Sequence, residues 1–288
     1  MKTGFAILTL VSAFSLQPSA SVCAATTIDA ANHFAYGANL GWLDWRGDTN
    51  NGAVIGEYVC AGNLYSANVG WINLGSGSPT NGISYQNLSA SDFGVNQDGL
   101  GNLRGYAYGA NIGWITFEGT GAPKLDLYTG NLSGSVWSAN CGWISLSNTA
   151  AFVQTDTIRQ GALAPIGLPS AWLLANFGTT NVDANADPDH DGQSNGQEYV
   201  AGTNPNDAND YLRITAITRG SPPSTATALW WPGKPTRFYG VQRRSTLTAS
   251  SSWLEFYTST WPEVTSIGFN QTADQQFYRV RAFRPLMP

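Results

Sequence analysis

Residues 36–42 read Tyr36-Gly-Ala-Asn39-Leu-Gly41-Trp42, and this short stretch decides the fold of the first half of the chain. The same pattern returns three times, as Tyr65-Ser-Ala-Asn68-Val-Gly70-Trp71, Tyr108-Gly-Ala-Asn111-Ile-Gly113-Trp114 and Trp137-Ser-Ala-Asn140-Cys-Gly142-Trp143. The first and third copies lie 72 residues apart, and so do the second and fourth. A unit of two motifs has therefore been duplicated, which is typical of a repeat architecture.

Each motif predicts a β-hairpin. Asparagine and glycine tolerate positive φ in a tight turn, and the residues after each tryptophan alternate between apolar and polar with period two. We expect residues 26–158 to form a pseudo-symmetric β-sandwich or barrel. A propeller is less favoured, because about 120 residues are few for four-stranded blades.

The aromatic residues of the repeat have two interpretations. Exposed tryptophan and tyrosine rings could stack on sugars, or each pair could face its partner across the hairpin and fill the core. Recurrence at a fixed turn position favours the core. Trp45 and Phe117, just beyond the regular motif, are then the better candidates for exposed ligand contacts.

A twelve-residue loop carries the clearest chemical signal: Asp187-Pro-Asp189-His-Asp191-Gly192-Gln193-Ser-Asn195-Gly-Gln-Glu198. Oxygen-bearing side chains stand at positions one, three, five, nine and twelve, and glycine stands at position six. This is the spacing of an EF-hand-type calcium loop, in which Gln193 offers its backbone carbonyl and Glu198 closes the site bidentately. The predicted metal ligands are Asp187, Asp189, Asp191, Gln193, Asn195 and Glu198, and the predicted ion is Ca²⁺.

The surrounding segment, residues 161–210, resembles the thrombospondin type 3-like calcium repeats of exported bacterial proteins. The resemblance continues past the loop through Tyr199, Gly202, Thr203, Asn204 and Pro205. An upstream loop keeps Gly167, Pro169 and Trp172, but alanine and isoleucine stand at its ligand positions, Ala162, Ala164 and Ile166. Those side chains cannot bind a cation, so we expect one calcium ion rather than two.

The N-terminus predicts export. Lys2 precedes an apolar run from Phe5 to Leu16, and small residues follow, so residues 1–24 read as a signal peptide with cleavage near Ala24. No run is long enough for a transmembrane helix. The net charge of −5 argues against nucleic acid or an anionic membrane as a partner. We therefore expect a secreted or cell-surface protein.

Two cysteines remain after removal of the signal peptide, Cys60 and Cys141. An oxidising compartment favours a disulfide between them, whereas their non-equivalent positions in the repeat argue against the required geometry. Both states stay open at this point.

Residues 211–288 contain short alternating runs separated by turn residues, which predicts an immunoglobulin-like or fibronectin type III-like β-sandwich. The whole chain is thus expected to be mainly β, with a short calcium-loop and helix segment between two β modules. The last module has a positive bias from basic residues that include Arg237, Arg243, Arg244, Arg279, Arg281 and Arg284. We expect them on solvated strand faces, with surface anchoring or a contact to an anionic glycan as the alternative.

We expect no enzymatic activity. The chain has only two histidines, His33 and His190, and neither lies in a nucleophile or zinc motif. Glu57 and Glu118 would be the first pair to test for glycoside hydrolysis.

The sequence favours a calcium-binding structural or adhesion protein in which the calcium loop stiffens the joint between two β modules. The alternative is a secreted carbohydrate-binding protein that uses the tryptophan-rich repeat. Under either hypothesis, the partner of this protein would be a surface polysaccharide or a matrix or cell-surface protein.

Overall fold

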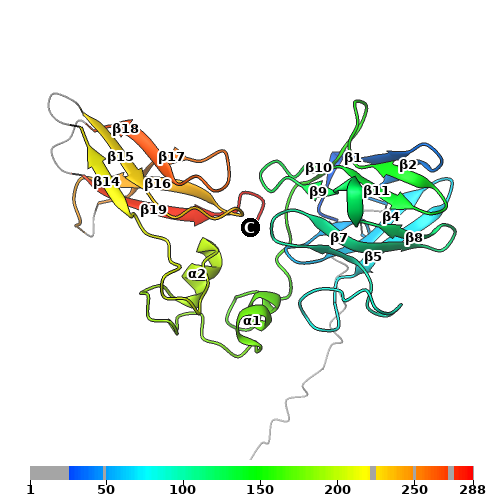
Figure 1. The fold of residues 1–288 in the computed structure, drawn as a ribbon, viewed down its shortest axis with the longest axis horizontal. Helices are drawn as coiled ribbons and strands as arrows, with labels where there is room; N and C mark the ends of the chain where they lie inside the picture. Colours follow the sequence, from blue (N-terminus) through cyan, green and yellow to red (C-terminus); the bar gives the residue numbers. More distant parts are fainter. Residues whose placement is uncertain (1–25, 48–49, 221–224, 249–250, 272–275, 288) are drawn as a thin grey trace, which may run out of the picture.

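The computed structural model describes residues 26–287 except 48–49, 221–224, 249–250 and 272–275. Two β modules lie side by side, and a short segment with two helices connects them (Figure 1). The expected mainly β fold is confirmed. The expected signal peptide and its cleavage site lie outside the described residues.

The first module is a closed ring of antiparallel strands. Its order is β1-β2-β4-β5-β7-β8-β11-β12, and β12 pairs with β1 to complete the ring. The strands of the ring are β1 (Ile28–Gly37), β2 (Gly41–Asp44), β4 (Cys60–Ser66), β5 (Gly70–Ser76), β7 (Leu103–Gly109), β8 (Gly113–Thr116), β11 (Ser135–Ser138) and β12 (Gly142–Ser145). Shorter strands flank it: β3 (Val54–Ile55), β6 (Val95–Gln97), β9 (Lys124–Leu125), β10 (Leu132–Ser133) and β13 (Val153–Thr155). The repeat therefore builds a barrel rather than a sandwich.

Each copy of the motif forms one hairpin of this barrel. In the first copy Tyr36 lies opposite Trp42 and Gly37 lies opposite Gly41. Gly41 adopts a φ of 79°, which closes the three-residue loop. The glycines at the same position in the other copies, Gly70, Gly113 and Gly142, also have positive φ. The four predicted hairpins form, and the motif glycines adopt the positive φ that their turns require. The motif asparagines do not have positive φ, and their side chains serve a different purpose.

The four asparagines hold the hairpins to one another. The side-chain amide of Asn68 donates to the carbonyl of Leu40 in the preceding motif (3.0 Å). Asn111 donates to Val69 (3.0 Å), and Asn140 donates to Ile112 (3.0 Å). Asn39 donates to Cys141 (3.2 Å), and this bond returns from the first motif to the last. The four bonds thus form a cycle at the turn end of the barrel.

The paired aromatic rings of the motif lie on the outside of the barrel, so the prediction that they fill the core is wrong. Tyr36 is 40% exposed and Trp42 49%, and the other three pairs are similarly half-exposed. The rings do face each other across the hairpin, as predicted; Tyr36 and Trp42 are 5.0 Å apart. The interior at this end is narrow and is filled by small residues such as Gly37 and by the loop side chain of Leu40.

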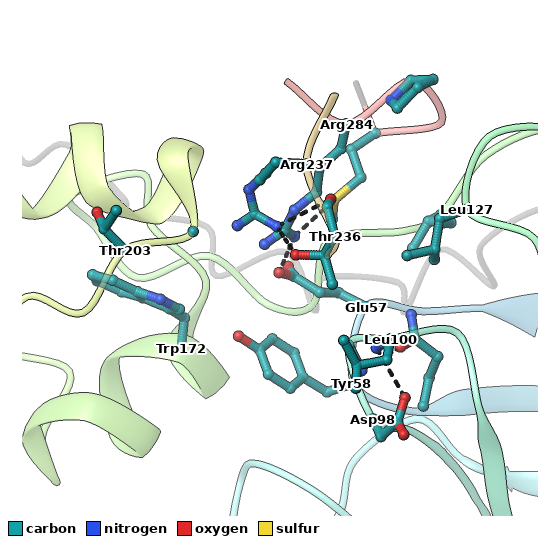
Figure 2. Close-up of a pocket in the computed structure, with 16 residues that line it drawn as sticks. Glu57, Tyr58, Asp98, Leu100, Leu127, Trp172, Thr203, Thr236, Arg237 and Arg284 are labelled. Carbon is teal, nitrogen blue, oxygen red and sulfur yellow. Dashed lines mark hydrogen bonds and ion pairs between the residues drawn. The ribbon is translucent and has the colours of Figure 1, made fainter. Parts of the chain in front are cut away.

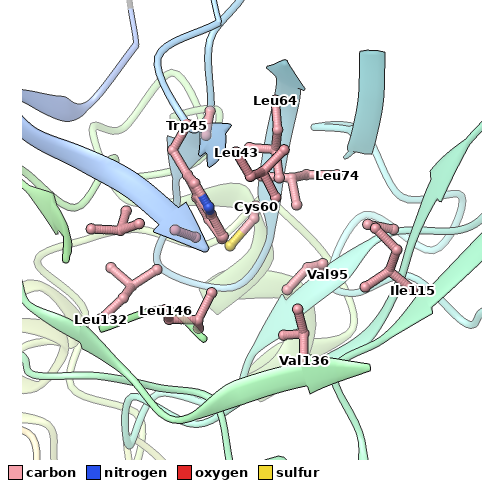
Figure 3. Close-up of a cluster of buried hydrophobic side chains, with 14 of the residues drawn as sticks. Leu43, Trp45, Cys60, Leu64, Leu74, Val95, Ile115, Leu132, Val136 and Leu146 are labelled. Carbon is pink, nitrogen blue, oxygen red and sulfur yellow. The ribbon is translucent and has the colours of Figure 1, made fainter. Parts of the chain in front are cut away.

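Trp45 and Phe117 are not exposed ligand contacts; each is only 1% exposed. The reason is the two-residue period of a strand, which places every second side chain on the same face. Trp42 points outward, so Leu43 and Trp45 point inward, and Ile115 and Phe117 do the same after Trp114. The buried cluster in Figure 3 includes Trp45 together with leucine, valine and isoleucine side chains from around the ring.

Cys60 and Cys141 are both buried free thiols, so no disulfide joins them. Cys141 sits in a hairpin loop at the turn end of the barrel, whereas Cys60 begins β4, six residues before that end. Six residues of strand span about 20 Å, much more than the roughly 7 Å that a disulfide tolerates between Cα atoms. Burial raises the pKa of the Cys60 thiol to about 12.

The last module is a sandwich of two three-stranded sheets, as expected. One sheet has the order β14-β15-β18 and the other β17-β16-β19. The strands are β14 (Ala216–Arg219), β15 (Ala226–Trp230), β16 (Phe238–Arg244), β17 (Leu254–Thr258), β18 (Ser266–Asn270) and β19 (Phe277–Phe283). Leu229 of the first sheet and Tyr239, Val241 and Ala282 of the second belong to one buried cluster.

The chain returns to the barrel after this sandwich. Leu286 and Met287 pack against the barrel core, and the carbonyl of Leu286 accepts a hydrogen bond from the Ile158 amide (2.8 Å). Tyr128 of the barrel stacks on Phe238 of the sandwich with ring centroids 5.2 Å apart. The two β modules therefore touch directly as well as through the connecting segment.

The helices of the connecting segment are α1 (Ser170–Phe177) and α2 (Asn195–Ala201). A 3-10 turn, η1 (Gly119–Gly121), lies in the barrel. Within the described part of the chain, neither helix has the length and apolarity that a membrane crossing needs.

The asparagine cycle predicts a specific loss of stability. Asn39→Ala removes the bond that joins the first and last hairpins, and we expect the free energy of unfolding to fall by about 1 kcal/mol. Urea denaturation of the wild-type and variant proteins measures the difference. Asn185→Ala is the control, because its exposed side chain forms no hydrogen bond with a described residue. Equal unfolding midpoints for wild type and Asn39→Ala would show that the cycle does not contribute.

Candidate metal site

The predicted calcium loop lies between α1 and α2, and its last ligand positions belong to α2. Asn195 begins this helix and Glu198 follows in its first turn. The Gln197 side chain accepts a hydrogen bond from the Ser194 amide (2.8 Å) and fixes the start of the helix. The loop and the helix therefore share two residues, and a displacement of one moves the other.

The aspartates of the loop converge on one point. Asp187, Asp189 and Asp191 each offer a carboxylate oxygen, and these oxygens all lie within 4.8 Å of one another. Gly192, at position six, has a φ of 93°, which is the left-handed conformation that a sharp turn needs. The structure thus brings the first three predicted ligands together.

Each aspartate uses one oxygen to shape the loop and leaves the other without a partner. Oδ2 of Asp187 accepts from the Gly192 amide (2.9 Å), and Oδ1 of Asp191 accepts from the Gln193 amide (2.7 Å). Oδ1 of Asp189 accepts from the Asp191 amide (3.3 Å). The remaining oxygens, Asp187 Oδ1, Asp189 Oδ2 and Asp191 Oδ2, are buried and have no hydrogen-bond partner.

Asn195 and Glu198 repeat this arrangement. The amide nitrogen of Asn195 donates to the carbonyl of Asp183 (2.8 Å), while its Oδ1 is buried without a partner. Oε1 of Glu198 accepts from the Thr203 hydroxyl (3.4 Å), while its Oε2 is buried without a partner. All five side chains that the spacing marks as ligands therefore present an unpaired oxygen, and buried polar atoms are rarely left unpaired in proteins.

Gln193 contributes differently. Its side-chain amide donates to the carbonyl of Leu212, at the entrance to the sandwich module (2.8 Å). The side chain is therefore directed away from a ligand role, and the backbone carbonyl at position seven remains as the predicted donor. This bond also ties the loop to the last module.

The negative charges of the loop carboxylates repel one another. Burial, together with the charges of Asp189 and Asp191, raises the pKa of Glu198 to about 7. Burial likewise raises the pKa of Asp191. The three converging aspartates and the nearby Glu198 are unfavourable without a counterion. A set of oxygen donors alone suits a hard divalent cation such as calcium.

The degenerate upstream loop contributes buried side chains to a hydrophobic cluster. Ala164 is buried in a cluster with Leu168, Trp172 and Tyr199. Trp172 and Tyr199 meet with ring centroids 5.6 Å apart, so this loop packs α1 against α2. The alanine at a ligand position thus has a hydrophobic role in place of cation binding.

A second group of residues lies beside the loop, and of these the sequence had named only Glu57 as a candidate for chemistry. The Tyr199 hydroxyl donates to Oε2 of Glu57 in the barrel (2.8 Å). Arg284 of the sandwich forms an ion pair with Glu57 and lies over the Tyr199 ring, 5.1 Å from its centroid. Figure 2 shows Glu57, Arg237 and Arg284 gathered between the modules, with Trp172 across a cavity of about 230 Å³.

Comparison with protein-family models, with curated proteins and with solved structures finds no match. The interpretation of the site therefore depends on its geometry.

The unpaired oxygens predict a stabilising calcium ion. At a free concentration one hundred times the dissociation constant, calcium should raise the free energy of unfolding by about 2.7 kcal/mol. Asp191→Ala should abolish most of this gain, whereas Asp207→Asn, a loss of charge outside the loop, should preserve it. Denaturant unfolding with calcium and with chelator measures both. A wild-type protein that is equally stable in the two conditions would contradict the site.

Proposed function

We propose that this protein is a secreted or cell-surface structural or adhesion protein in which a bound calcium ion fixes the orientation of two β modules. One observation carries the proposal: the calcium ligand Glu198 is followed directly by Tyr199, whose atoms contact both modules. The two residues share the first turns of a short helix. The position of the ion therefore determines the position of Tyr199.

Tyr199 reaches the barrel through its side chain and the sandwich through its backbone. Its hydroxyl donates to Glu57 and accepts from Nε2 of Gln160 (3.1 Å). Its carbonyl accepts from Nη2 of Arg237 (2.8 Å), and the next carbonyl, that of Val200, accepts from Nε of the same guanidinium (2.7 Å). We name Glu57, Tyr199, Arg237 and Arg284 the joint cluster.

Burial makes the joint cluster sensitive to displacement. Glu57 is 5% exposed and Arg237 2%. Burial, together with the charge of Arg284, lowers the pKa of Arg237 to about 9. Removing one partner from a buried charge costs about 3–5 kcal/mol, so the modules are held in the one arrangement that pairs all of these groups.

Calcium acts on this cluster through α2. With the ion absent, repulsion among the four carboxylates favours a wider loop. Asn195 and Glu198, in the first turn of α2, then lose their bonds to the ion. Tyr199 then no longer has a fixed place against Glu57. Since extracellular calcium modules work at dissociation constants of about 10⁻⁴–10⁻³ M, such a joint would be rigid outside the cell.

We expect the two modules to tumble as one body with calcium and more independently with chelator. Amide ¹⁵N relaxation of the full chain gives a rotational correlation time for each module. The values should agree in calcium and diverge in chelator. A single shared correlation time in both conditions, with calcium binding still measurable by calorimetry, would show that the ion binds without controlling the joint.

Tyr199→Phe tests the connection between the ion and the joint. The variant keeps the ring but loses the hydrogen bond to a buried carboxylate, which should lower the free energy of unfolding by about 1–3 kcal/mol. It should also weaken the effect of calcium on the correlation times. Tyr58→Phe is the matched control, because the Tyr58 hydroxyl lines the same cavity and forms no hydrogen bond with a described residue.

A second candidate function is the binding of a neutral carbohydrate by the outer aromatic pairs. The observation that favours it is their exposure: Trp42, Trp71, Trp114 and Trp143 are each 46–50% exposed on one belt around the barrel. Half-exposed rings of this kind can stack on sugar rings as well as stabilise their hairpins.

The double variant Trp42→Ala with Trp71→Ala tests this second candidate. If the belt binds sugar, affinity for a neutral oligosaccharide such as cellohexaose should fall about tenfold, as expected for the loss of one stacking contact or more. Trp261→Ala is the control, because this side chain is 74% exposed in the other module. Calorimetry that detects no sugar binding to the wild type, or equal losses in both variants, would reject the belt.

A further inference from the structure

The charge of the chain is divided between its modules. Residues 26–210 carry four basic and sixteen acidic side chains, whereas residues 211–288 carry nine basic and three acidic ones, a net charge of +6. The overall charge of −5 conceals this positive module. An anionic partner would therefore be attracted to the sandwich and repelled by the rest of the molecule.

Three of the eight arginines in residues 211–288 share one face of the sandwich. Gln242 of β16 pairs with Arg279 of β19, and Gly240 pairs with Arg281, so these side chains share a face with Arg244. The opposite face of the same sheet carries Tyr239, Val241 and Ala282, which lie in the core. The arginine face is therefore the outer one, and we define it by Arg244, Arg279 and Arg281.

Neighbouring groups hold the guanidinium groups in place. Arg244 and Arg279 lie over the ring of Trp253, 4.6 and 4.5 Å from its centroid. Nε of Arg279 donates to the side-chain oxygen of Gln242 (2.6 Å). These contacts orient the two cations without neutralising them, since neither forms an ion pair with a described residue. Nε of Arg244 is buried and has no hydrogen-bond partner.

An ion pair with Glu255 neutralises the charge of Arg281, so the positive charge without an ion-pair partner lies elsewhere on the face. Nε of Arg281 donates to Oε2 of Glu255 (2.6 Å), and this contact lowers the pKa of Glu255 to about 2. Glu255 thus stays charged at neutral pH and pairs with Arg281. The positive charge available to a partner centres on Arg244 and Arg279.

A cavity of about 350 Å³ adjoins Arg244 and adds Arg243 and several uncharged polar side chains. It is lined by Arg243, Arg244, Ser245, Ser252, Leu254, Gln271 and Gln276. Hydroxyl and amide side chains beside fixed guanidinium groups match a ligand that alternates anionic groups with hydroxyls. Trp253 is held by arginines, so its ring offers little surface for stacking with a nucleic-acid base.

We propose that the arginine face binds an acidic polysaccharide. Its carboxylate or sulfate groups pair with Arg244 and Arg279 as charge-assisted hydrogen bonds, and its hydroxyls meet the polar cavity. This inference goes beyond the calcium joint and does not depend on it, because the arginine face contains no residue of the calcium loop. Binding should be the same with calcium and with chelator.

Biolayer interferometry of the full chain on immobilised heparin and on alginate tests the proposal, since one polymer is sulfated and the other carries carboxylates. Arg244→Gln with Arg279→Gln should weaken binding by about tenfold or more, the effect of losing one charge-assisted hydrogen bond. Arg213→Gln with Arg219→Gln removes the same charge away from the face and should change the affinity much less. Rising salt should weaken wild-type binding.

Three results would overturn the proposal: no binding to either polymer, equal losses in the two double variants, or equally tight binding to duplex DNA or phosphatidylserine vesicles at the same salt concentration. The second result would show that binding depends only on net charge. The third would show that the module attracts any polyanion. If the glutamine variant does not fold, Arg244→Lys with Arg279→Lys replaces it. That variant keeps the charge but loses the planar donors, and an undiminished affinity would then contradict a geometric site.

Discussion

The carboxylate of Glu57 constrains the whole molecule, because a charge that is only 5% exposed must keep its partners. Its partners come from two other parts of the chain, Tyr199 of the connecting segment and Arg284 of the last module. The three parts therefore cannot move independently without exposing or stranding this group. The direct contacts between the β modules, such as Tyr128 on Phe238, complete a joint whose polar centre is Glu57.

The sequence predicted the local units well and their surroundings poorly. The spacing of the motif identified each hairpin, and the spacing of the loop identified the oxygens that converge. The sequence analysis assigned the aromatic side chains to the wrong faces of their strands. The two-residue period after Trp42 already places Leu43 and Trp45 together on the face opposite to Trp42. The narrow turn end of the barrel, which excludes large rings, is a property of the closed ring and appears only when all hairpins are assembled.

Long-range pairing accounts for the other gaps. Glu57 and Tyr199 are 142 residues apart, and nothing local to either residue indicates that they meet. The same holds for Cys60 and Cys141, whose separation follows from their places along the barrel axis. The asparagine of the motif was interpreted through its turn, whereas its amide bonds to a different hairpin. Sequence patterns describe neighbours along the chain, and these contacts lie between distant segments.

The cyclic bonding of Asn39, Asn68, Asn111 and Asn140 also bears on how such a barrel could arise. A half with two hairpins satisfies one amide internally and leaves one amide donor and one carbonyl acceptor at its open seam. Two such halves satisfy each other, as two separate chains or as one duplicated chain. A symmetric homodimer of the two-hairpin unit would therefore form the same four bonds as the single duplicated chain.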